Sequence, residues 1–301
     1  MSDLFTYNTI LVLLGTSLLG AASGMIGAIA VQRRQALAGD VFAHAALPGL
    51  CIAFMVVGDR NLLALLIGAF VSGILGLVCV SLISRASRIK PDAALGIVLS
   101  TFFGLGIVLS RVIQNQAGTG SKAGLDSYIL GKTAGIIASD VYLIASAAVI
   151  ALFLIVLLFK ELRMLSFDAD FAQSQGWPVR RLDLLLIGLL GLIVVMGLSA
   201  VGVVMMAALL ILPGVSARFW TDRFSVMLWL SAGFGIITGS IGTILSAKYA
   251  NLPAGPIIVL VGAGLFLLSA IVAPRRGLIA RWRTSKYVDL SLLPPEVVRA
   301  S

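Results

Sequence analysis

Residues 8–31 read NTILVLLGTSLLGAASGMIGAIAV, an apolar stretch without a single Asp, Glu, Lys or Arg. A helix needs about 20 such residues to cross the hydrocarbon core of a bilayer. Most of the chain consists of similar stretches, since 59% of its 301 residues are hydrophobic, 12% are charged and the mean hydropathy is +1.08. Soluble domains carry about 25% charged residues. The sequence therefore predicts an all-α integral membrane protein without a soluble domain.

The apolar stretches predict about nine transmembrane helices in one bundle. The second stretch is short and the sixth runs almost into the seventh, so some helices are expected to be short or broken. The predicted spans are approximately 8–31, 41–57, 61–83, 92–110, 139–159, 182–199, 201–217, 224–247 and 255–273.

The positions of Lys and Arg predict the orientation, because cytoplasmic loops of membrane proteins carry an excess of both. With nine alternating spans and the N-terminus outside, 17 of the 22 Lys and Arg residues fall inside and 5 outside. This places the C-terminus inside, with a basic cytoplasmic tail at 276–301. The net charge of +9 is thus explained by topology, and it does not indicate nucleic-acid binding.

One long inside link is unusual in composition. Residues 160–181 read KELRMLSFDADFAQSQGWPVRR and mix apolar with charged side chains. They are expected to form one or two short helices, ended by Gly176 and Pro178. The link is either a solvated connector or a docking surface for a cytoplasmic partner.

The only histidine in the chain, His44, follows Asp40 by four residues in GDVFAHAALPG, 39–49. On a helix this spacing places both side chains on one face. Imidazole and carboxylate suit divalent ions such as zinc and manganese. Two ligands are too few for a closed site, and a two-fold dimer would supply four. The alternatives are a helix-capping Asp40 and a hydrogen-bonded core histidine.

Prolines and glycines interrupt several apolar stretches. A proline within a span frees a carbonyl group, and broken helices are common in transporters. Two glycine-containing stretches, 20–24 and 235–242, predict close helix packing. The candidate helix-break or pathway residues are Pro48, Pro213, Gly214, Pro253 and Gly255.

The sequence lacks the residues that several classes of enzyme require. The chain has no phosphate-binding loop of the type GxxxxGK[ST], so it does not hydrolyse ATP as a P-loop enzyme. One histidine and two separate cysteines, Cys51 and Cys79, do not form a catalytic triad or a zinc centre. The sequence therefore argues against a P-loop ATPase, a histidine-based triad and a catalytic zinc site.

Three motifs in this order resemble the permease family of bacterial metal-ion ABC importers: LAGDVFAHAALPGL (37–50), MAALLILPGVSA (206–217) and LPAGPIIVLVG (252–262). The resemblance covers about 8–275 and implies a permease domain at 1–275. It makes Asp40 and His44 metal contacts. It also makes 160–181 the segment that meets the ATPase, with contacts at Phe167, Asp168, Phe171, Gln175, Gly176 and Trp177.

The resemblance further implies a multi-pass transport subunit of the bacterial inner membrane that is no enzyme, has no ATPase site of its own and relies on a partner subunit to hydrolyse ATP. Its partners would be a second permease subunit, identical or different, two cytoplasmic ATPase subunits and an extracytoplasmic solute-binding protein. Manganese, zinc or iron would be the transported substrate, with no resident cofactor. Three alternatives stay open: an ABC permease for an iron chelate, haem or cobalamin, a membrane-embedded enzyme, and a secondary metal transporter.

Overall fold

The computed structural model describes residues 7–33, 35–58, 61–115, 131, 136–249, 252–279 and 282. This part of the chain is helical and contains no strand. The helices that form the bundle are α1 (Tyr7–Gln32), α2 (Ala38–Val57), α3 (Leu62–Ala86), α4 (Pro91–Asn115), α6 (Ala138–Leu157), α9 (Val179–Ala200), α10 (Val203–Trp220), α11 (Phe224–Lys248) and α12 (Ala254–Val272).

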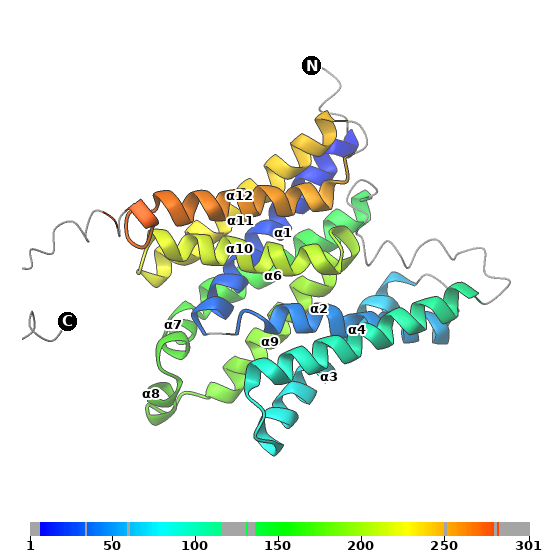
Figure 1. Cartoon of the computed structure of the whole chain (residues 1–301), viewed down its shortest axis with the longest axis horizontal. Helices are drawn as coiled ribbons and strands as arrows, with labels where there is room; N and C mark the ends of the chain where they lie inside the picture. The colour runs from blue at the N-terminus through cyan, green and yellow to red at the C-terminus, as the bar shows by residue number, and fades with distance from the viewer. Residues whose placement is uncertain are drawn as a thin grey trace, which may run out of the picture.

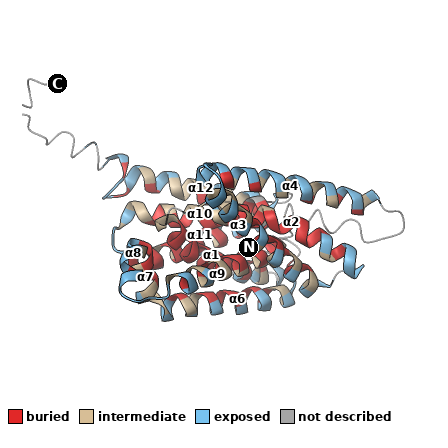
Figure 2. Ribbon diagram, turned by 90° about the horizontal axis from the view of Figure 1, so that it is seen from below, coloured by how far each residue is buried: buried red, intermediate tan, exposed pale blue. Residues whose placement is uncertain are grey.

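These helices confirm the predicted spans, each end within five residues. Among the described residues, eight of them are long and apolar enough to cross a bilayer, and α10 is a shorter apolar helix. The apolar side chains on the outer faces of α3, α4 and α12 are largely exposed (Figure 2). Exposed apolar faces of this kind suit the hydrocarbon of a membrane.

The bundle has two groups of helices with α9 between them (Figure 1). In one group α1 packs against α6, α10 and α11, and α12 covers α10 and α11. In the other, α2 packs against α3 and α4. Helix α9 contacts members of both groups, including α1 and α2. Helix α9 thus connects the two groups, and α10 adds a direct contact with α2.

Glycines bring α1 and α11 into backbone contact, which confirms the predicted close packing at these residues and identifies the two helices that meet. A Cβ atom on Gly20 would lie 2.3 Å from the carbonyl oxygen of Gly235, and one on Gly239 would lie 2.5 Å from the carbonyl oxygen of Thr16. The hydroxyls of Thr16 and Thr243 lie 2.9 Å apart across the same contact. Small residues and interhelical hydrogen bonds drive helix association in lipid, where water does not supply a hydrophobic force.

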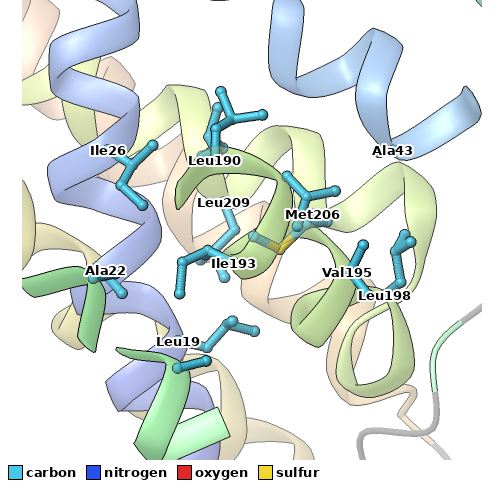
Figure 3. Close-up of a cluster of buried hydrophobic side chains, with 14 of the residues drawn as sticks. Leu19, Ala22, Ile26, Ala43, Leu190, Ile193, Val195, Leu198, Met206 and Leu209 are labelled. Carbon is cyan, nitrogen blue, oxygen red and sulfur yellow. The ribbon is translucent and has the colours of Figure 1, made fainter. Parts of the chain in front are cut away.

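The interior between the two groups is filled with aliphatic side chains (Figure 3). Ile193 of α9 is fully buried and faces α1, and Met206 of α10 is also fully buried. The labelled members of this cluster are Leu19, Ala22, Ile26, Ala43, Leu190, Ile193, Val195, Leu198, Met206 and Leu209. Close packing makes such a core transmit displacement, because it has few voids that absorb movement.

Two short helices, α7 (Phe159–Phe167) and α8 (Ala169–Ser174), lie at one end of the bundle between α6 and α9 (Figures 1 and 2). The Asp168 side chain caps α8 by accepting a hydrogen bond from the Phe171 amide at 2.9 Å. The chain turns at Gly176, whose φ is +82°, and Pro178 precedes α9. The prediction of one or two short helices that end before Gly176 is confirmed.

Candidate metal site

The candidate site lies in the first two turns of α2. His44 Nε2 lies 3.3 Å from Asp40 Oδ1, and the two side chains are 13% and 24% exposed. The predicted shared face is therefore present. The capping alternative for Asp40 is wrong, because Leu37 occupies the N-cap position and no side chain caps the helix. Asp40 instead lies in the first turn, where the helix dipole favours a carboxylate.

The second nitrogen of His44 is the notable atom of this site. Nδ1 is buried and has no hydrogen-bond partner among the described residues. The ring meets the edge of Phe103 from α4 at a centroid distance of 4.8 Å and an angle of 89°. A buried polar atom without a partner is unfavourable by about 1–3 kcal/mol. In the tautomer with its proton on Nε2, which lies beside the Asp40 carboxylate, Nδ1 carries a lone pair that can bind a cation.

Pro48 leaves the backbone carbonyl oxygen of His44 without its usual hydrogen bond in the helix. Proline has no N–H, so the carbonyl of His44, four residues earlier, receives no hydrogen bond within the helix. Pro48 is buried in the middle of α2, and a Cβ atom on Gly106 of α4 would lie 3.2 Å from its Cδ. Pro48 thus lies about one helical turn after His44 in α2 and packs against α4.

Neighbouring helices hold this turn of α2 closely. The fully buried ring of Phe42 packs against Gly73 of α3 and Gly191 of α9, where a Cβ atom would lie 2.4 and 2.6 Å from ring carbons. Leu210 of α10 packs against Gly39, where a Cβ atom would lie 2.7 Å from Cδ2 of Leu210. The two site residues thus sit on a turn whose position depends on α3, α9 and α10.

The other candidate pathway residues lie in a different part of the bundle. Pro213 is buried within α10, and Gly214 packs against the backbone of α1, where its Cβ would lie 2.7 Å from the Ala28 nitrogen. Pro253 is the N-cap of α12, as expected of a proline at a helix start, and Gly255 packs against Met205. In the described part of the chain these contacts join α1, α10 and α12.

The candidate docking segment exposes apolar rings at the end of the bundle. Phe167, Phe171 and Trp177 are 60%, 52% and 37% exposed, although Phe167 also packs its ring on Phe224 of α11 at 6.0 Å. Exposed apolar side chains outside the membrane-spanning region are typical of a binding surface. The remaining predicted members of this surface, all exposed, are Asp168, Gln175 and Gly176.

Two contacts were not predicted from the sequence. One is Phe103 against His44, and the other is an ion pair between Arg33 and Asp183. No local pattern relates residues so far apart in the chain, so only the packing reveals them. An apolar cavity of about 210 Å³, lined by side chains that include Met25, Phe159 and Leu228, lies among α1, α6, α7 and α11, away from α2.

One chain offers an incomplete set of metal ligands. Among the described residues, no group of three or more His, Cys, Asp or Glu side chains is placed to hold an ion. Asp40 and His44 together supply one oxygen and one nitrogen donor. A closed site would therefore need further ligands, and the two-fold dimer expected from the sequence stays a prediction.

Comparisons with known proteins agree with the resemblance in the three motifs. The model of the ABC 3 transport family matches residues 6–273. The manganese transport system membrane protein MntC of Bacillus subtilis is 46% identical over 274 residues, which are 91% of this chain and 63% of that protein. The chain thus spans less than two thirds of that relative's length.

Two further matches cover nearly the whole of both chains. The zinc transport system membrane protein TroC of Treponema pallidum is 42% identical over 286 residues, 95% of each chain. The solved structure of PsaBC from Streptococcus pneumoniae in complex with Fab superposes with a TM-score of 0.81 at 30% identity, covering 94% of this chain and 96% of that one.

Proposed function

We propose, since the chain belongs to the ABC 3 transport family, that it is the permease subunit of an importer for divalent metal ions in the bacterial inner membrane. Relatives named for manganese and for zinc transport support this substrate class. The bundle of apolar helices supplies the membrane-spanning part. The absence of a phosphate-binding loop from the sequence means that a partner subunit must hydrolyse ATP.

The observation that carries the proposal is the Asp40–His44 pair with its unpartnered Nδ1. A carboxylate and an imidazole, both partly buried, match the ligand preferences of manganese, zinc and iron ions. In a two-fold dimer of permeases, two such pairs would provide four ligands. The metal ion, delivered by an extracytoplasmic binding protein, would contact this site on its way into the cytoplasm.

The orientation and the docking segment belong to the same proposal. With the N-terminus outside and the C-terminus inside, α7 and α8 face the cytoplasm, where an ATPase subunit can bind. The permease domain would then comprise 1–275, and the basic tail 276–301 would be cytoplasmic. Most of that tail lies outside the described residues.

Metal uptake by the complete transporter tests the proposal. The chain is co-expressed with an ATPase and a binding protein encoded beside it, and accumulation of manganese, zinc and iron is measured by elemental analysis. Asp40→Ala and His44→Ala should each reduce uptake about 100-fold or more, because each removes a metal ligand. Asp92→Ala is the matched control, since Asp92 also lies in the first turn of a helix, α4.

Each outcome of this measurement has a clear meaning. Uptake that is lost in the two site variants and retained in Asp92→Ala supports the metal site. Normal uptake in folded Asp40→Ala rejects it. If the wild type accumulates no ion but takes up an iron chelate, haem or cobalamin, the alternative substrate class is correct.

Gly176 tests the docking segment separately. Its φ of +82° is open to glycine and tolerated by asparagine, whereas proline is restricted to about −65°. Gly176→Pro should therefore lower both ATPase association and uptake at least tenfold, while Gly176→Asn should keep most of both. Equal ATPase association by the two variants, measured by co-purification, would reject the docking role.

A further inference from the structure

Arg33 and Asp183 form an ion pair between two elements that are 150 residues apart in the chain. Arg33 Nη1 lies 2.5 Å from Asp183 Oδ1, and the side chains are 11% and 36% exposed. The guanidinium N–H groups are not aligned on this oxygen, which has no hydrogen bond among the described residues. The contact is thus an ion pair, and it is more buried than the exposed pairs of Asp222 with Arg275 and Arg276.

This ion pair joins the link between α1 and α2 to the start of α9. Arg33 follows the last turn of α1, in the short link that leads to Asp40. Asp183 lies in the first turns of α9, directly after the docking segment of α7 and α8. Figure 1 shows that the α1–α2 link, α7, α8 and the start of α9 all lie at the same end of the bundle.

Helix α9 also contacts the turn of α2 that carries Asp40 and His44. The ring of Phe42 packs against Gly191, where a Cβ atom would lie 2.6 Å from Cζ. Phe42 stands between Asp40 and His44 in the sequence, two residues from each. Asp183 and Gly191 are eight residues apart, about 12 Å along one helix. The segment from Arg33 to Phe42 is therefore held to α9 at both of its ends.

We propose that these two contacts make Arg33, Asp183 and Gly191 positioning residues, which couple movement of the docking segment to the Asp40–His44 pair through α9. Buried, close-packed contacts transmit displacement because they have few alternative arrangements. When a partner ATPase moves α7 and α8, α9 moves with them and carries the first turns of α2. This inference rests on the proposed function and adds the route by which ATP hydrolysis reaches the metal.

Breaking the ion pair tests the coupling in the complete transporter reconstituted in vesicles. The readouts are metal ions transported per ATP hydrolysed, ATPase activity without metal, and thermal stability. Asp183→Asn and Arg33→Gln should keep the ATPase activity within twofold and lower the transport ratio at least fivefold. Asp183→Glu, which keeps the charge, should retain most of the ratio. Asp222→Asn breaks an ion pair that does not contact α2, and should leave the ratio unchanged.

A charge swap separates coupling from simple stability. Arg33→Asp with Asp183→Arg restores opposite charges across the contact, and should recover at least half of the wild-type ratio. A wild-type ratio in folded Asp183→Asn overturns the proposal. A swap that regains the thermal stability of the wild type but not its transport ratio also overturns the proposal, because the pair is then only structural. If the wild type itself moves no metal with ATP, the proposed function fails first, and that result is distinct from either of these.

Discussion

The contact between α1 and α11 and the first turns of α2 are both rich in small and polar residues. They differ in whether their buried polar atoms have hydrogen-bond partners. Between α1 and α11, the hydroxyls of Thr16 and Thr243 pair at 2.9 Å, and those of Ser17 and Ser240 at 2.8 Å. In α2, His44 Nδ1 is buried without a partner in the described part of the chain.

This difference distinguishes polar groups that stabilise helix packing from a polar atom that is available to bind an ion. A polar group that serves association in lipid finds a partner on the neighbouring helix, and this is what α1 and α11 show. A buried polar atom left unpaired is unfavourable, and its presence in a native protein needs an explanation such as an ion that binds there. The difference agrees with the proposal that the α1–α11 contact serves stability and that the α2 turn serves transport.

The largest expected effect is on metal uptake, and a substitution of His44 distinguishes a role in transport from a role in packing. His44→Leu removes the unpaired nitrogen with a side chain of similar volume, so the free energy of unfolding should stay the same or rise by about 1 kcal/mol. Metal uptake should nevertheless fall about 100-fold or more. Thermal unfolding in detergent and elemental analysis of cells measure the two effects. A variant that is both unstable and inactive would make His44 a packing residue.

The next effect is on stability at the α1–α11 contact. Gly235→Ala places a Cβ atom 1.9 Å from the carbonyl oxygen of Gly20, so backbone must move, at a cost of about 2–3 kcal/mol. Gly233→Ala on the same helix meets no atom within 4 Å and should be neutral or slightly stabilising. Thermal unfolding in detergent measures the stability of both variants. Equal stability of the two variants would mean that the helices do not approach this closely.

A smaller effect is expected from the hydroxyl pair. Thr16→Val removes the hydrogen bond to Thr243 at constant shape and should lower the free energy of unfolding by about 1 kcal/mol. Thr101→Val is the control, because its hydroxyl bonds only the carbonyl of Ile97 in its own helix and is exposed. A loss of the same size in both variants would show that the interhelical bond adds nothing.

The smallest effect concerns Asp222, in the link between α10 and α11. A hydrogen bond from Arg275, aided by Arg276, lowers the pKa of this carboxyl below its ordinary value of 3.8. Because the folded pKa is depressed, the ion pairs contribute full stability above about 3.8 and lose it as the pH falls through the folded pKa. Asp222→Asn should change the melting temperature slightly at neutral pH and abolish this part of its acid dependence.

The sequence predicted the helices well because each prediction used local information. A stretch of about 20 apolar residues forms a spanning helix whatever surrounds it, and all nine stretches became helices. The spacing of Asp40 and His44 was also sufficient, since four residues along a helix place side chains on one face. The capping role for Asp40 was wrong because the helix begins earlier, at Ala38.

By itself, then, the sequence determined which segments are helical and which residues of α2 stand together, since helix geometry relates neighbours along the chain. Only the tertiary structure decided that Gly20 meets Gly235, that Gly191 receives the ring of Phe42, and that Arg33 pairs with Asp183. These choices depend on how helices far apart in the chain fit against one another. Helical periodicity indicates a packing face, but it does not specify which helix will cover it.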